Sequence, residues 1–117
     1  MQYMLLIYGD QKARVALPAA AIGEAVAAYE AYTRALQGSG ALVAANRLAD
    51  TDSASTVRLR DGKRQVLDGP YAETKEQLGG YYLIEAKDLD AALDWAARCP
   101  GAAHGAVEVR PLWQMTN

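Results

Sequence analysis

Two helix-length patterns, each flanked by strand-length apolar runs, constrain the fold of this chain more than any other feature. The first begins at Pro18, which suits the first turn of a helix, and ends at Gly38 and Gly40. Its apolar stripe consists of Ile22, Val26, Tyr29, Thr33 and Leu36. The second begins after Asp88, a suitable N-cap, and ends at Pro100-Gly101. Its buried stripe is expected to consist of Leu89, Ala92, Leu93, Ala96 and Ala97.

Strand patterns surround these two helices. The predicted strands are residues 2–9, 41–49, 55–60, 63–67, 81–86 and 105–114. The third and fourth form a hairpin, because Asp61-Gly62 is a strong signal for a two-residue turn. This order predicts an α+β fold: a ferredoxin-like βαββαβ subunit with an inserted β-hairpin, and with both helices on one face of an antiparallel sheet.

The other face of that sheet is also rich in apolar side chains. In the first strand, the two alternate sets, Tyr3, Leu5 and Ile7 on the one hand and Met4, Leu6 and Tyr8 on the other, are both apolar. Water is a poor cover for such a face, and a second copy of the chain is a better one. We therefore expect a homodimer packed sheet to sheet, with any pocket formed between the sheet and its partner.

Composition narrows the function classes. The chain has 117 residues, enough for one domain over 1–117, and a net charge of −2 with scattered cations, which does not indicate a nucleic-acid partner. No apolar run is long enough to span a membrane. The single cysteine, Cys99, and the lack of a signal-peptide pattern predict a reducing cytoplasm. One histidine and one cysteine cannot form a His/Cys metal cage, and no nucleotide-binding fingerprint is present, so we expect no cofactor.

The densest polar stretch, residues 68–86, has both a folding and a functional interpretation. Asp68 either ends the hairpin in an Asx-type turn or contributes to a site. Thr74 and Gln77 have the spacing of a capping box, which predicts a helical turn over 75–78 closed by the glycine pair 79–80. Glu73 and Lys75 would then be solvated, or would fold over a pocket and bind a polar ligand.

Three further residues have two interpretations each. Glu85 lies in mid-strand, where it either takes part in an ion pair at the dimer interface, with Arg110 and Glu108 of the last strand as the candidates to pair with it, or acts as a catalytic carboxylate. His104 is either a hydrogen-bonded loop residue or a proton-exchanging group. Tyr82 is expected in the core or interface, like Tyr8 and Tyr81, with a hydroxyl that reaches a partner or a ligand.

Three stretches, "MQYMLLIYGD", "DGPYAETKEQLGGYYLIEAKDLDAALDWAARCP" and "HGAVEVRP", resemble the DGPF proteins of the YCII-related family. Tyr71 replaces the phenylalanine of the DGPF motif. The resemblance implies a dimeric α/β barrel built from ferredoxin-like subunits. It also implies a small enzyme with a histidine and an aspartate in a cleft, for which His104 and Asp68 are the available residues. Members of the DGPF branch often accompany extracytoplasmic-function sigma factors in bacterial genomes.

Two hypotheses follow from the sequence. In the first, a cytoplasmic homodimer binds or turns over a small organic molecule in a polar cleft; the residues assigned to it are Asp68, Glu73, Lys75, Tyr82, Glu85, His104 and Arg110. In the second, the chain is a non-catalytic interaction module associated with a sigma-factor system. Nothing in the sequence specifies a reaction.

Overall fold

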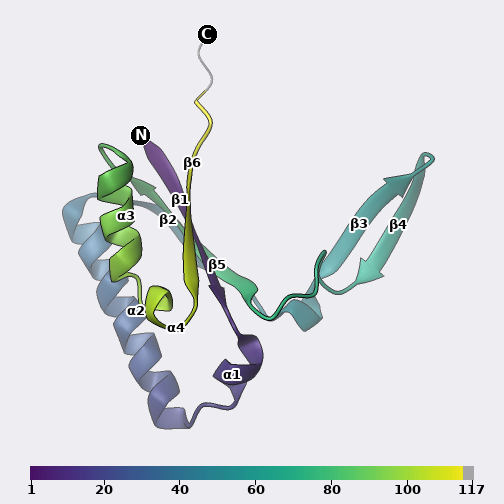
Figure 1. Ribbon diagram of the computed structural model, residues 1–117, viewed down its shortest axis with the longest axis horizontal. Helices are drawn as coiled ribbons and strands as arrows, with labels where there is room; N and C mark the ends of the chain where they lie inside the picture. Colours follow the sequence, from purple (N-terminus) through teal and green to yellow (C-terminus); the bar gives the residue numbers. More distant parts are fainter. Residues whose placement is uncertain (115–117) are drawn as a thin grey trace.

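The computed structural model describes residues 1–114 and has a mixed α+β architecture (Figure 1). Its elements are β1 (Gln2–Gly9), α1 (Gln11–Val15), α2 (Ala19–Ser39), β2 (Leu42–Arg47), a 3-10 turn (Thr51–Ser53), β3 (Ser55–Arg60), β4 (Lys63–Asp68), β5 (Gln77–Glu85), α3 (Leu89–Arg98), α4 (Gly101–His104) and β6 (Ala106–Pro111). Among these helices, none is long and apolar enough to cross a membrane.

Four strands form one antiparallel sheet in the order β2-β5-β1-β6, while β3 and β4 pair only with each other. The two strands at the centre of the larger sheet are therefore β5 and β1. Helices α2 and α3 both lie against one side of this sheet, and the β3–β4 hairpin extends from the opposite side (Figure 1).

The core lies between the sheet and the two helices. Leu5, Leu36 and Ile84 are completely buried there, from β1, α2 and β5 respectively. Tyr32 of α2 connects the layers, since its hydroxyl donates to the backbone oxygen of Trp95 in α3 at 2.6 Å and its ring meets that of Tyr82 edge-on, with centroids 5.2 Å apart. This packing leaves the opposite side of the sheet without a layer of its own.

Helix α2 begins after Pro18 and ends at Gly40, whose left-handed φ of 79° gives the C-terminal stop that the sequence predicts. The predicted apolar stripe is only partly correct, because Ile22 and Val26 are exposed. The N-terminal half of α2 runs beyond the end of α3, so this helix does not cover it (Figure 1).

Helix α3 begins where Asp88 caps it, accepting a hydrogen bond from the Ala91 amide at 2.9 Å, as predicted. Its predicted stripe is confirmed at Ala92 and Ala96, which are buried, and wrong at Leu89, Leu93 and Ala97, which are exposed. Sequence analysis also misses α1, a single helical turn whose amides at Lys12 and Ala13 are capped by the side chain of Asp10.

The predicted helical turn over 75–78 is wrong. Residues 71–76 form bends, Gln77 is the first residue of β5, and Gly79 and Gly80 lie inside that strand at a β-bulge opposite Ile7. The Gln77 side chain bonds the Thr74 oxygen at 2.5 Å and accepts from the Gln11 amide at 3.0 Å. Pairing with β1 satisfies the backbone here, and this tertiary pairing overrides the local capping signal.

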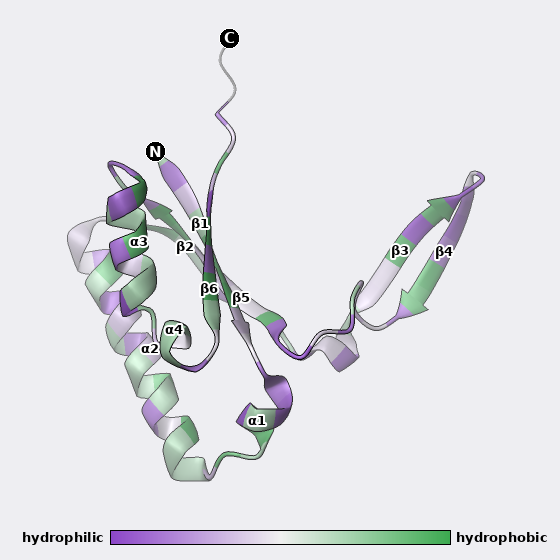
Figure 2. Cartoon of the chain, in the orientation of Figure 1, coloured by the Kyte–Doolittle hydropathy of each residue, from purple (hydrophilic) through white to green (hydrophobic). Residues whose placement is uncertain are grey.

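The predicted hairpin is confirmed. Asp61 and Gly62 both have positive φ, 52° and 75°, which is the conformation of a type I′ turn. Apolar and polar residues alternate along β3, whereas β4 has a polar half, 63–65, followed by the apolar pair Val66 and Leu67 (Figure 2). We call this hairpin, β3 with β4, the arm, because it stands apart from the rest of the subunit (Figure 1).

Candidate functional site

The side of the four-stranded sheet that faces away from the helices is the candidate site. Side chains alternate along a strand, and Tyr3, Leu5, Tyr82 and Ile84 are buried on the helix side, so the residues between them point the other way. We call this side the open sheet face. It consists of Met4, Leu6, Tyr8, Ala44, Asn46, Leu78, Tyr81, Leu83, Glu108 and Arg110.

The centre of the open sheet face is apolar. Strand register places Leu83 of β5 and Met4 of β1 side by side, with Leu6 of β1 as the next outward-pointing residue of its strand. All three are only half-buried, because no element within residues 1–114 covers them. The face therefore offers a hydrophobic strip to whatever packs on it.

Two hydrogen-bonded polar pairs flank this strip. On one side, the Asn46 amide nitrogen donates to the Tyr81 hydroxyl at 2.8 Å. On the other, the Tyr8 hydroxyl donates to Glu108 Oε1 at 3.3 Å. Burial, and then the negative charge of Glu108, raise the pKa of Tyr8 above its usual value. At neutral pH, Tyr8 is consequently a proton donor and not a base.

Arg110 supplies a positive charge at the edge of the same strip. Register places it opposite Met4, and its charge opposes the rise in the pKa of Tyr8. Within residues 1–114 its guanidinium takes part in no ion pair. A guanidinium beside apolar side chains and hydroxyl groups is suited to a ligand with a carboxylate and a carbon skeleton.

The charged residues predicted near the hairpin do not join this group within one subunit. Asp68 is the last residue of β4, opposite Ser55, and is exposed on the arm. Glu73 and Lys75 are exposed in the irregular segment that connects β4 to β5. All three lie on or next to the arm and away from the strip that Met4 and Leu6 form.

His104 and Tyr82 lie on the helix side of the sheet. His104 is the exposed last residue of the short helix α4. Tyr82 is 6% exposed, and its hydroxyl is 2.8 Å from Thr33 Oγ1 of α2, beneath that helix. The structure therefore does not bring His104 together with Asp68, which is on the arm (Figure 1).

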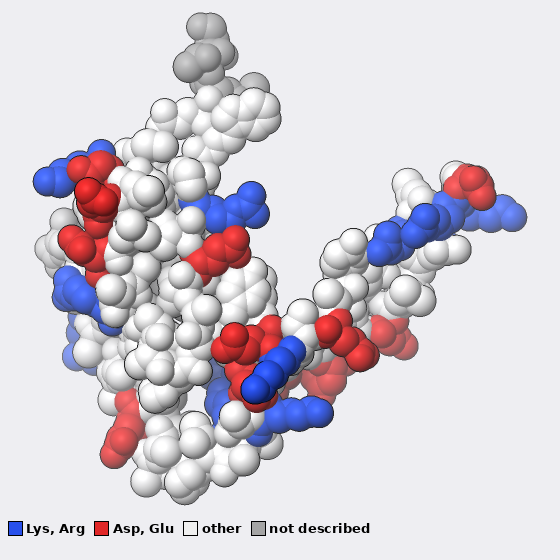
Figure 3. All heavy atoms as spheres, viewed as in Figure 1, with Lys and Arg blue, Asp and Glu red and all other residues white. Residues whose placement is uncertain are grey.

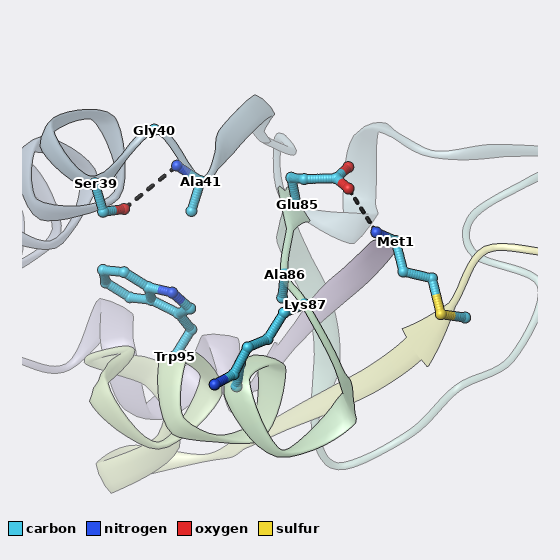
Figure 4. Close-up of a pocket in the computed structure, with 9 residues that line it drawn as sticks. Met1, Ser39, Gly40, Ala41, Glu85, Ala86, Lys87 and Trp95 are labelled. Carbon is cyan, nitrogen blue, oxygen red and sulfur yellow. Dashed lines mark hydrogen bonds and ion pairs between the residues drawn. The ribbon is translucent and has the colours of Figure 1, made fainter.

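Within the subunit, Glu85 and the last strand are not neighbours, because β1 lies between β5 and β6; the predicted ion pair across a dimer interface stays a prediction. Glu85 pairs instead with the Met1 ammonium at 2.5 Å. It borders an open depression of about 430 Å³, where Lys87 follows β5 and the Trp95 ring of α3 forms the opposite wall (Figure 4). Two of the charged groups that line this depression, the Glu85 carboxylate and the Met1 ammonium, pair with each other. Lys87 is the third charged group of its lining.

Sequence analysis did not select Tyr8, Asn46, Tyr81 and Glu108 as ligand-binding residues. The sequence signal that could have indicated this face is the second apolar set of the first strand, Met4, Leu6 and Tyr8, because it shows that both sides of the sheet must be covered. Their hydrogen bonds depend on register across different strands, and sequence spacing does not give that register. In the part of the chain that the structure describes, no three His, Cys, Asp or Glu side chains are grouped closely enough to hold a metal ion.

The family model of the YCII-related domain matches residues 1–116. The chain belongs to the YCII-related family. This YCII-related protein is also 40% identical over 114 residues to an uncharacterised protein of Rhizobium meliloti (strain 1021), a match that covers 96% of this chain and 92% of the relative. The similarity thus extends over the sheet, the helices and the arm together.

Proposed function

We propose that this YCII-related protein acts in the cytoplasm as a homodimer of ferredoxin-like subunits, whose open sheet faces pack together as an α/β barrel and bind a small organic acid between them. The observation that carries the proposal is the open sheet face itself. It combines an apolar strip, two hydrogen-bonded polar pairs and the guanidinium of Arg110. The strand order β2-β5-β1-β6 also supports a ferredoxin-like subunit.

Each group on this face has a role in binding. Arg110 pairs with the carboxylate of the ligand, and the apolar side chains of Met4 and Leu6 contact its carbon skeleton. The Tyr8 hydroxyl, held by Glu108, orients the ligand and is the proton donor for any acid-base step. Asp68, Glu73 and Lys75 reach the cleft from the partner's arm segment, whereas Tyr82, Glu85 and His104 have no role in this version of the site.

Sedimentation velocity tests the dimer. Wild type should sediment as a dimer, whereas Leu6→Asp, which places a carboxylate in the apolar strip, should sediment as a monomer. Ala103→Asp is the matched control, because it adds the same charge at an exposed position of α4 on the helix side. A wild-type protein that remains monomeric at high concentration would refute the proposal.

Thermal shift with benzoate tests the ligand class. Benzoate should raise the unfolding temperature of wild type more than benzamide, its uncharged counterpart, since only benzoate can pair with the guanidinium. Arg110→Gln should remove this difference while sedimenting as a dimer. Equal effects of benzoate and benzamide, or a benzoate effect that survives Arg110→Gln, would contradict the assignment of an organic acid.

The exposed arm favours a second candidate, a non-catalytic interaction module that works with an extracytoplasmic-function sigma factor. Val57 and Leu59 of the arm contact nothing of their own subunit that would bury them. This candidate predicts that a purified sigma factor of that class is retained on the immobilised protein, whereas the first predicts benzoate binding without it.

A further inference from the structure

The arm stands away from a compact body. The subunit measures 51 × 47 × 18 Å and has a radius of gyration of 16.4 Å, against about 13 Å for a compact chain of this length. Its surface of 8380 Å² exceeds the roughly 6,200 Å² of a compact monomer of its mass by about a third. That excess of roughly 2,200 Å² is of the size that a large dimer interface removes from each subunit.

The direction of the arm is set at its base. The Gln11 side chain of α1 accepts from the Thr51 hydroxyl at 3.0 Å, and Arg14 of α1 pairs with Asp50. The guanidinium of Arg58 in β3 lies over the ring of Tyr71, which follows β4, 4.9 Å from its centroid. These contacts hold the base against the body, while the two strands beyond it pair only with each other.

One face of the arm is apolar. Val57 lies directly opposite Val66, and Leu59 points to the same side; their exposed fractions are 58%, 47% and 73%. A two-stranded hairpin on its own is only marginally stable in water, so this face needs a surface to pack against. The body of the same subunit does not provide this surface, because an open hollow separates the body from the arm (Figure 3).

The other face of the arm is basic. It presents Arg58, Arg60 and Lys63 together with Leu67, whereas the fourth cation, Arg64, lies opposite Leu59 on the same face as Val57. The arm as a whole has four cations and two carboxylates, a net charge of +2. The rest of the chain has eight cations and twelve carboxylates, a net charge of −4. The arm is therefore electrostatically complementary to the body of another copy, which favours a second copy of this chain as its occupant.

Geometry favours the same occupant. The helices and the arm lie on opposite sides of the sheet, so the hollow between sheet and arm opens onto the open sheet face (Figures 1 and 3). A partner that packs on that face enters the hollow and meets the arm. By two-fold symmetry its own arm meets the first subunit in the same way, and both apolar arm faces are covered.

We propose that the arm is a dimerisation clamp, in which Val57, Leu59 and Val66 pack on the body of the partner subunit that occupies the hollow. The proposal rests on the sheet-to-sheet dimer proposed above, and it adds a second interface to that dimer. Because each dimer has two arms, a single substitution in the clamp changes the free energy of dimerisation at two contacts.

Sedimentation equilibrium of arm variants tests the clamp. Leu59→Asp should raise the dimer dissociation constant at least about tenfold, because it removes a buried leucine from each of two symmetric contacts. Gln65→Asp is the matched control: it adds the same charge to the opposite face of the arm and should change the constant by less than about threefold. Leu59→Gln, which adds no charge, separates loss of packing from repulsion and should also weaken the dimer.

The outcomes distinguish this proposal from the proposed function. If Leu59→Asp and Leu59→Gln dimerise like wild type while Leu6→Asp is monomeric, the clamp is refuted and the sheet-to-sheet dimer stands. If Leu59→Asp and Gln65→Asp weaken the dimer equally, the apolar face is not the contact and the clamp is again refuted. Duplex DNA that binds wild type but not Arg60→Gln would make the arm a nucleic-acid contact and overturn the clamp. A monomeric wild type would refute both proposals.

Discussion

Two explanations exist for the glycine pair Gly79 and Gly80 in β5: a stop for a helical turn, as the sequence suggests, or close approach of the neighbouring strand, as in the structure. Replacement of each glycine by alanine separates them. A Cβ atom at Gly80 would lie 2.8 Å from the Asn46 carbonyl oxygen and 3.3 Å from Arg47 Cα, both backbone atoms of β2. Backbone atoms of a paired strand cannot rotate away, so β2 or β5 must shift. A Cβ atom at Gly79 would meet only the Ile7 oxygen, at 3.9 Å, which is an ordinary contact.

The expected magnitude follows from these distances. Overpacking of this kind costs about 1–3 kcal/mol of unfolding free energy. Both substitutions also restrict the unfolded chain, which stabilises each variant by about 0.4–1 kcal/mol. That contribution is the same for both variants and cancels when their stabilities are compared. Backbone strain does not add to the difference, because neither glycine has a positive φ. Gly80→Ala should therefore be less stable than Gly79→Ala by about 1–3 kcal/mol, or by roughly 3–15 °C in unfolding temperature.

Thermal unfolding followed by circular dichroism measures this difference. The two variants and wild type are compared at one protein concentration, because the unfolding temperature of a dimer depends on concentration. Gly79→Ala should unfold at or slightly above the wild-type temperature. Gly79→Ala that is as unstable as Gly80→Ala, or less stable, would refute the strand geometry and restore the helix-stop explanation that the sequence suggests.

Two predictions concern buried titratable groups. Cys99 is 2% exposed and burial raises the pKa of its thiol, so Ellman's reagent should modify the native protein far more slowly than the denatured protein; equal rates would contradict its burial. Burial raises the pKa of Tyr29 from about 10 to about 12. The unfolded state then loses its proton first, and stability should fall as the pH rises from about 10 to about 12. Tyr29→Phe should reduce that fall relative to Tyr71→Phe, a control at an exposed ring; identical alkaline unfolding curves for the two variants would count against it.

Features with a strong local cause were predictable. The Asp61-Gly62 turn forms because both residues tolerate positive φ, and Asp88 begins α3 because its side chain accepts from a free amide of the first turn. Both causes act within a few residues. The capping signal at Thr74 and Gln77 is equally local but weaker, and it gives way to pairing of Gln77 with β1.

The candidate site was less predictable than the fold. Arg110 could be selected from the sequence as a charged residue of a strand, but its place beside Met4 depends on the register of β1 with β6. Glu85 is separated from the last strand of its own subunit by β1, a relation that depends on the strand order of the sheet. Such relations join residues far apart in the chain, where no spacing rule applies.

The sequence by itself determined the family, through the stretches that resemble DGPF proteins. It also determined the kinds and order of the main elements and the existence of a second apolar sheet side, because hydrophobic periodicity expresses these directly. Only the tertiary structure decided that this side has two hydrogen-bonded polar pairs, that the glycine pair lies within a strand, and that the hairpin stands free as an arm. The physical reason is that strand register and the packing of whole elements are set by contacts between distant residues, each satisfied only when the others have formed.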